Sequence, residues 1–203
     1  MKSRWLRRNI VPALAMLPVS VILSAQTPQH PVTIHLDPAR TAIRWTLGDV
    51  LHTVHGTFAM KGGIITLDPA TGHADGEVIV ELDSGDSGNA TRDRLMKGKI
   101  LQTATYPEAI FHPEKVSSAP KPGAEQQITV DGTFTIHGND HPLRLVMTVR
   151  MSAADDLAAT TEFAVPYVAW GMKDPSTFVL RVEKQVTVDV SAEGTVDSTG
   201  SSP

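Results

Sequence analysis

The chain has 203 residues, no cysteine and a formal net charge of −4 at pH 7. This length suits one domain of ordinary size, and the lack of cysteine excludes disulfides and a lipid anchor on an N-terminal Cys. The acidic balance argues against partners that need a basic face, such as nucleic acid or an anionic membrane surface.

The first 25 residues have the layout of a secretory signal peptide. Four basic residues come first, namely Lys2, Arg4, Arg7 and Arg8. The apolar run over 10–23 that follows contains two prolines and is shorter than the roughly 20 residues of a transmembrane helix. We therefore expect a Sec-type signal rather than twin-arginine export, cleavage after Ala25, a periplasmic or secreted location, and no stable membrane anchor.

Cleavage would remove four cations and no acids, which leaves 14 Lys and Arg against 22 Asp and Glu, a formal charge of −8. Residues 26–31 are polar and read as a leader, and residues 197–203 are small and polar and predict a disordered tail. The folded domain is therefore expected over 32–196.

Apolar and polar residues alternate with a period of two through most of this domain, which predicts half-buried antiparallel strands. The clearest runs cover 42–47, 77–82, 127–136, 143–151 and 186–191. Turn sequences separate the runs at Gly62-Gly63, 68–72, 120–123 and 138–140. About eight or nine strands joined in this way predict an all-β domain, and the pattern leaves open whether it is a sandwich or a barrel.

One segment departs from the alternation. A polar loop over 84–89 precedes a predicted helix from Thr91 to about Leu101. Thr91 can cap this helix, and Asp93 suits its positive end. Gly98 weakens the helix, so we expect it to be short or irregular.

A protease-like motif occurs in the loop before this helix. Gly85-Asp86-Ser87-Gly88 resembles the nucleophile motif of chymotrypsin-like proteases, with His55 and Asp68 upstream. Those enzymes need two barrels, and this chain has room for about one. We therefore interpret the motif as a turn and expect no catalytic residues.

Two histidine pairs, His52/His55 and His137/His141, have spacings seen in metal sites. A zinc site needs a third or fourth ligand and an organised second shell, which the sequence does not reveal. We expect neither a metal site nor a cofactor.

Several motifs together resemble the YceI-like family. They are Leu36-Asp37-Pro38, 54–58, 90–95 followed by 104–111, and 131–138 followed by Pro142-Leu143. The resemblance extends from about Val32 to Val196. It implies a lipocalin-like antiparallel β-barrel with a short helix near one end. It also implies a periplasmic or secreted protein without catalytic residues that binds an isoprenoid lipid, such as a quinone tail or a polyprenyl precursor.

Large apolar residues on the inward faces of such a barrel would line the lipid channel. The expected lining residues are Trp45, Leu47, Phe58, Val78, Val80, Phe111, Phe134, Ile136, Leu145, Met147 and Phe163. The segment Tyr167–Phe178, with Trp170 and Met172, is the candidate mouth or lid. Its alternative role is a connection whose aromatic residues cap the core.

The main prediction is thus a carrier of a long-chain apolar lipid, and two other functions stay open. One is a dry-cored module that binds an envelope protein through an exposed strand edge. The other is a hydrolase or isomerase that acts on an amphiphilic lipid. A carrier requires an apolar cavity, an enzyme requires a polar cluster inside it, and a module requires neither. The sequence also leaves open whether two barrels form a homodimer.

Overall fold

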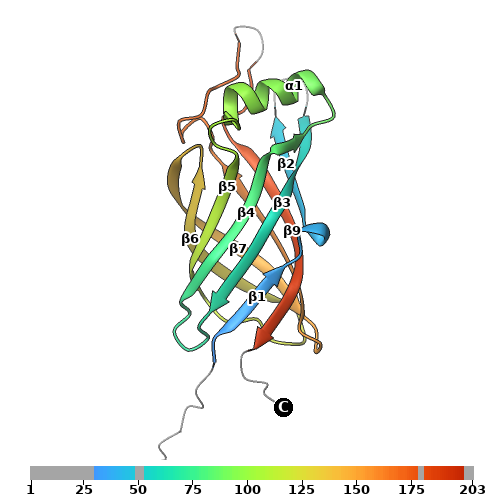
Figure 1. The fold of residues 1–203 in the computed structure, drawn as a ribbon, viewed down its shortest axis with the longest axis vertical. Helices are drawn as coiled ribbons and strands as arrows, with labels where there is room; N and C mark the ends of the chain where they lie inside the picture. Colours follow the sequence, from blue (N-terminus) through green and yellow to red (C-terminus); the bar gives the residue numbers. More distant parts are fainter. Residues whose placement is uncertain (1–29, 49–52, 178–180, 199–203) are drawn as a thin grey trace, which may run out of the picture.

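The computed structural model describes residues 30–48, 53–177 and 181–198. These residues form nine antiparallel strands that make up one closed sheet (Figure 1). The strands are β1 (Val32–Leu36), β2 (Ala42–Gly48), β3 (Thr53–Leu67), β4 (Ala74–Asp86), β5 (Glu108–Val116), β6 (Gln126–Ile136), β7 (Asn139–Met151), β8 (Asp156–Val165) and β9 (Val186–Ser198). The predicted signal peptide, the leader up to residue 29 and tail residues 199–203 lie outside the described residues.

The sheet closes through β3, which pairs with β2 on one side and with β4 on the other. β1 and β2 share one position in the wall, because both lie between β3 and β9. The strands from β4 to β9 follow one another in chain order. The result is an antiparallel barrel of eight strand positions, as the sequence predicted, and the sandwich is excluded.

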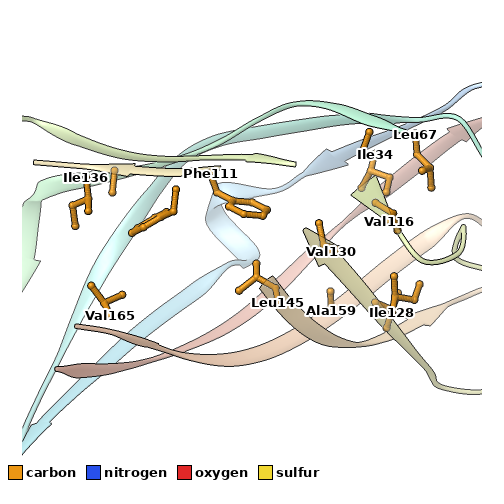
Figure 2. Close-up of a cluster of buried hydrophobic side chains, with 14 of the residues drawn as sticks. Ile34, Leu67, Phe111, Val116, Ile128, Val130, Ile136, Leu145, Ala159 and Val165 are labelled. Carbon is orange, nitrogen blue, oxygen red and sulfur yellow. The ribbon is translucent and has the colours of Figure 1, made fainter. Parts of the chain in front are cut away.

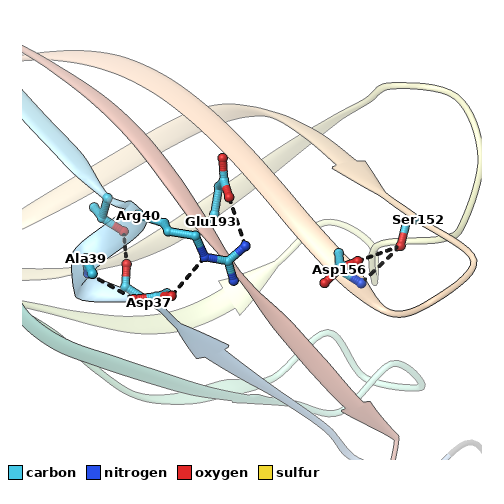
Figure 3. A network of polar contacts seen from close by, with 7 residues as sticks. Asp37, Ala39, Arg40, Ser152, Asp156 and Glu193 are labelled. Atoms are coloured by element: carbon cyan, nitrogen blue, oxygen red, sulfur yellow. Dashed lines mark hydrogen bonds and ion pairs between the residues drawn. The ribbon is translucent and has the colours of Figure 1, made fainter.

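A single 3₁₀ turn, η1 (Pro38–Arg40), separates β1 from β2. Asp37 holds this turn, since its carboxylate accepts from Ala39 N at 2.9 Å and from Arg40 Nε at 2.8 Å. Arg40 also donates to Glu193 Oε2 on β9 at 3.1 Å, which ties the turn to the neighbouring strand (Figure 3). The chain therefore leaves the wall for one turn and re-enters it at the same position.

The residues Gly62 and Gly63 lie inside β3, which corrects the turn expected there. The pairing of β3 with β4 shifts between Met60 and Gly62, the signature of a β-bulge. Buried positions fall on Met60 before the shift and on Gly63 and Leu67 after it. The bulge thus moves the inward face from even-numbered to odd-numbered residues.

The remaining connections follow their turn chemistry. The Asp68 carboxylate accepts from Ala70 N at 2.9 Å and from Thr71 Oγ1 at 2.7 Å, which closes the β3–β4 turn as predicted. The β6–β7 hairpin turns on His137 and Gly138, with φ of 53° and 75°. It lies one residue earlier than expected, because His137 takes the left-handed conformation as well.

The predicted helix is present as α1 (Ala90–Leu95) followed directly by the π-helical turn η2 (Met96–Leu101). Asn89, not Thr91, is the N-cap, because its Oδ1 accepts from the backbone N–H groups of Thr91 and Arg92 at 3.1 Å. β4 continues to Asp86, so the loop before the helix is shorter than predicted. Figure 1 shows α1 across the upper end of the barrel, opposite the start of β1.

β9 reaches Ser198, two residues beyond the expected end of the domain. Asp197 and Ser198 pair with Thr33 and Val32 on β1, so the tail expected from residue 197 starts later. None of the helices in the described ranges is long and apolar enough to span a membrane.

Buried side chains from all sides of the wall point into the barrel and extend from Ile136 and Val165 to Leu67 and Ile128 (Figure 2). Leu67 is 1% exposed, and Ile128 and Val196 are each 3% exposed. They belong to strands that meet at the lower end through the 68–73 and 117–125 connections and the β1–β9 pairing. The same core cluster continues to the upper end, where it includes Ile136 and Val165.

Candidate functional site

The barrel encloses a cavity of about 760 Å³. Side chains from every strand line it, and residues of α1, η2 and the connection between β8 and β9 cover its upper end. The inward positions carry almost only apolar residues, because the two-residue alternation places polar residues on the outer wall. The cavity can therefore exclude water from an apolar guest.

Nearly all of the residues predicted to point inward border this cavity. Those that line it are Trp45, Leu47, Phe58, Val78, Val80, Phe111, Phe134, Ile136, Leu145, Met147, Phe163 and Met172. Trp170 does not line it and lies instead against Phe134, with ring centroids 6.0 Å apart. That these residues contact a lipid stays a prediction.

Aromatic side chains form two groups around the upper cavity. Phe134 meets Phe163 edge to face, with ring centroids 6.2 Å apart. On the other wall, the Trp45 and Phe58 rings are 6.4 Å apart. Trp45 fits because its cross-strand partner Gly56 has no side chain: a Cβ there would lie 2.3 Å from Trp45 Cζ2. Aromatic rings therefore line the cavity from two sides at this level.

The upper end is covered by what we call the closing segment, residues 166–177 and 181–185. Tyr167 and Met172 are buried and line the cavity. The Tyr167 hydroxyl donates to Glu183 O at 2.7 Å, and Glu183 N donates to Gly48 O at 2.9 Å. These bonds tie the two parts of the closing segment to each other and to the end of β2.

Burial, with a smaller contribution from Asp174, raises the pKa of Tyr167 to about 12. The phenol therefore stays protonated at neutral pH and keeps its role as a donor. Sequence reasoning placed a mouth or lid at Tyr167–Phe178, and the described part of that segment does lie at the upper end. Phe178 lies outside the described residues. The contribution of 181–185 was missed, because no local pattern links Glu183 to Tyr167.

The helix contributes a second cover. Leu95, Met96 and Ile100 line the upper cavity from α1 and η2. Asn89, Thr91 and Arg92 also line it, and they form the most polar part of the lining. Arg92 donates from Nε to Ser87 Oγ at 2.8 Å and from its terminal nitrogen to Ser87 O at 2.7 Å, so its guanidinium is anchored to the loop before the helix.

Other polar groups of the lining already have partners in the protein. Thr41 Oγ1 donates to Asp37 O at 2.8 Å, and Thr161 Oγ1 donates to Val146 O at 2.9 Å. Trp45 Nε1 is buried and has no hydrogen-bond partner among the described residues. Arg92 is the one charged side chain among the described lining residues, so the cavity contains no converging acid and base.

The protease-like motif forms a structural loop. Ser87 Oγ donates to the Asp93 carboxylate and accepts from Arg92, which fixes the entry to α1. His55 Nδ1 lies 3.1 Å from Thr46 Oγ1 on the barrel wall, and Asp68 closes a turn at the opposite end of β3. These three candidates do not form a triad.

The histidine pair at the β6–β7 hairpin has an aromatic environment. The His141 ring stacks on Trp170 with centroids 4.1 Å apart and an interplanar angle of 8°. The His137 ring lies 4.6 Å from that of Tyr106. Across the described residues, no three His, Cys, Asp or Glu side chains are arranged to hold a metal ion. His52, from the other pair, lies outside the described ranges.

Solved structures with the same fold come from several bacteria. A polyisoprenoid binding domain from Saccharophagus degradans has a TM-score of 0.64 at 14% identity, and the match covers 81% of this chain and 98% of that chain. BcnA from Burkholderia cenocepacia has a TM-score of 0.63 at 20% identity, covering 79% and 99%. The Campylobacter jejuni YCEI protein has a TM-score of 0.57 at 19% identity, covering 71% and 86%. At these identities the likeness establishes the fold.

A comparison with curated proteins finds no match. The family comparison gives a direct result, because the model of the YceI-like domain matches residues 35–194, which is most of the chain and nearly the whole barrel. The motifs at Asp37-Pro38, at the helix and at the β6–β7 hairpin all fall within the match. The chain belongs to the YceI-like family.

Proposed function

We propose that this protein is an exported, non-enzymatic carrier that holds one long apolar lipid of the isoprenoid type in its barrel. The observation that carries the proposal is the cavity of about 760 Å³ with an apolar lining. This volume falls within the range of about 300–1,000 Å³ for small-molecule sites, and eight-stranded barrels enclose one slender ligand. Each methylene moved from water into such a cavity contributes roughly 0.8 kcal/mol.

The ligand class is supported by family membership and by one neighbour in particular. The Saccharophagus degradans structure is a polyisoprenoid binding domain, and the match covers 98% of that chain. A quinone-like or polyprenyl-like chain suits the cavity described above, because its tail is apolar and its head could remain near Asn89 and Thr91 at the upper end. Met96 and Met147 on the lining can adapt to a branched chain.

The absence of enzymatic activity is part of the proposal. Acid–base catalysis needs titratable groups within hydrogen-bonding reach of a substrate. In the described part of the lining, the charged group is Arg92, which is bonded to Ser87. This supports binding over a hydrolase or an isomerase.

Export is proposed from the sequence of residues 1–25, which has the charge and apolar pattern of a Sec-type signal peptide. The mature protein would work in the periplasm or outside the cell. A carrier in either place would move an isoprenoid through water without leaving its tail exposed.

A pair of substitutions on one strand tests the binding site. Val80→Trp adds bulk on the inner face of β4, whereas Ile79→Trp adds the same side chain one residue away, at a position outside the cavity lining. We expect Val80→Trp to lose at least tenfold in affinity for a fluorescent isoprenoid, and Ile79→Trp to bind like the wild type. Circular dichroism and thermal unfolding would verify that both fold.

Equal binding by both variants would contradict a ligand inside the barrel. If the wild-type protein itself refused quinones and polyprenols on titration, the carrier function would be excluded and the interaction module would become the leading hypothesis.

A further inference from the structure

The helical end of the barrel is basic although the protein as a whole is acidic. α1 and η2 carry Arg92, Arg94, Lys97 and Lys99 against one acid, Asp93. Arg94 and Lys99 are exposed, and Lys97 is half-buried. Twelve consecutive residues at the mouth of the cavity therefore have a formal charge of +3.

Arg94, Lys97 and Lys99 have no acidic partner among the described residues, whereas most cations of the barrel wall do. On the wall, Arg40 pairs with Asp37, Lys61 with Glu108, Arg144 with Asp131 and Arg150 with Glu125. In the part of the chain that the structure describes, Arg94, Lys97 and Lys99 make no ion pair. Arg94 and Lys97 also flank a shallow hollow of about 410 Å³ that is otherwise lined by uncharged residues of 98–105. The unpaired charges are thus available to an external anion.

An apolar side chain lies among these cations. Leu95 is 55% exposed, one of three large apolar residues so exposed in the described ranges. It also lines the upper cavity, together with Met96 and Ile100 from the next turn. An exposed leucine between arginine and lysine residues is typical of helices that lie at a membrane interface.

The acids beside the helix are bonded within the protein. Asp83 accepts from Thr103 Oγ1 at 3.0 Å, Asp86 accepts from Gly88 N at 2.7 Å, and Asp93 accepts from Ser87 N at 3.0 Å. Asp174 and Glu183 lie at the same end in the closing segment, where Asp174 lies 3.9 Å from Lys184 Nζ. The Debye length is about 8 Å at physiological salt, whereas a strand of 15 residues such as β3 extends over roughly 50 Å. An anionic surface facing the helix would therefore respond to the local charge rather than to the net charge.

We propose that the face formed by Arg94, Leu95, Lys97 and Lys99 docks on a membrane surface rich in anionic phospholipid, which places the mouth of the cavity against the lipid source. The cations contact headgroup phosphates, and Leu95 inserts at the level of the acyl boundary. The purpose of docking rests on the proposed carrier function, since an isoprenoid could then pass between bilayer and barrel without crossing water. Docking itself does not require a bound isoprenoid.

Vesicle co-sedimentation tests the proposal directly. The exported protein, verified by mass spectrometry to lack residues 1–25, is mixed with vesicles of phosphatidylcholine alone or with phosphatidylglycerol added. We expect binding to the anionic vesicles only, and its loss in about 1 M salt, where the Debye length falls to about 3 Å. Each cation near an anionic surface contributes about fivefold to binding, so R94Q/K97Q/K99Q should bind on the order of a hundredfold more weakly.

The control is K115Q/K121Q near the opposite end of the barrel, which removes two exposed cations that make no ion pair with any described residue. It should bind vesicles like the wild type. Leu95→Ser should reduce binding several-fold while leaving the salt dependence intact.

Equal binding to neutral vesicles, or an equal loss in the triple variant and in the control, would overturn the docking surface. The docking surface would also be overturned if the protein bound no vesicles and the same residues captured an acidic protein instead. Isoprenoid loading is measured separately by native mass spectrometry. Vesicle binding without any loading would contradict the carrier function alone, and loading without vesicle binding would contradict docking alone.

Discussion

The two ends of the barrel use the same strands for different purposes. At the lower end, Leu67 on β3 and Ile128 on β6 are buried against their neighbours at 1% and 3% exposure. At the upper end, Phe58 on β3, Leu143 on β7 and Val188 on β9 also point inward but are only half-buried. Their exposed surface faces the cavity rather than the outside.

The difference shows that alternation alone decides which face is apolar but not whether the interior is filled. The same cavity reaches both ends, because Leu67 and Ile128 line it as well as Leu143. The two ends differ in how closely the lining side chains are packed, since the lower-end residues are almost fully buried and the upper-end residues named above are half-buried. A truncation should therefore cost more stability at the lower end, where packing is closer, whereas ligand binding should depend on lining residues at both ends.

The largest expected effect comes from the same truncation made at both ends. Leu67→Ala removes a fully buried side chain, so it should lower the free energy of unfolding by about 2–5 kcal/mol. Leu143→Ala should cost only about 1 kcal/mol, because this side chain is only half-buried. Urea unfolding of both variants measures the two values.

Lipid affinity should fall in both variants, because both side chains line the cavity. Under conditions where the proteins are folded, Leu67→Ala and Leu143→Ala should each weaken isoprenoid binding several-fold. Equal losses of stability at the two positions would contradict the division between a packed end and an open end.

A smaller effect is expected from Trp170, which holds the closing segment without lining the cavity. Trp170→Ala removes the stack on His141 and the contact with Phe134, each worth about 0.5–1.5 kcal/mol. The closing segment should open more readily, so a bound isoprenoid should dissociate about tenfold faster. Transfer of a fluorescent isoprenoid to acceptor vesicles measures this rate.

Lys173→Ala, at an exposed position of the same segment, is the control and should leave the rate unchanged. A dissociation rate that does not change in Trp170→Ala would show that the segment does not limit release.

The smallest effect concerns Tyr167 and appears only in alkali. Its pKa is raised from 10 to about 12 by burial, so below pH 10 the phenol is neutral in both the folded and the unfolded chain and no stability is lost. Between pH 10 and 12 the unfolded chain ionises first, and stability falls by up to about 3 kcal/mol. Tyr167→Phe should lose about 1 kcal/mol at neutral pH through the missing bond to Glu183 O.

Tyr167→Phe should also lose less of its free energy of unfolding than the wild type between pH 10 and 12, because it has no phenol to ionise at this position. The difference between the two proteins, followed by urea unfolding from pH 8 to 12, isolates this group because other tyrosines and lysines titrate in both. Parallel curves would show that Tyr167 does not stay protonated in the folded protein.

Much of the fold could be predicted from the sequence, because the two-residue alternation is local information. Trp45, Phe134 and Met147 point inward in the structure because each occupies an apolar position in an alternating run. The bulge after Met60 could not be foreseen, since it arises where β3 adjusts its pairing to β4. Gly62-Gly63 consequently read as a turn although the chain continues as a strand.

Contacts between distant segments account for the other differences. Trp170 was expected on the cavity lining, yet it stacks on His141, a partner that no local pattern identifies. β1 and β2 occupy one position because both pair with β3 and β9, and the η1 turn between them is stabilised by Glu193, far along the chain. Barrel closure itself depends on such pairings, which is why the pattern alone could not exclude a sandwich.

The proposal that matters most is that the barrel cavity holds an isoprenoid lipid. Native mass spectrometry of the exported protein, followed by lipid analysis of any released ligand, tests it most directly. We expect one bound isoprenoid per chain and its loss in Val80→Trp but not in Ile79→Trp. A folded barrel that carries no bound mass and accepts neither quinones nor polyprenols on titration would contradict it.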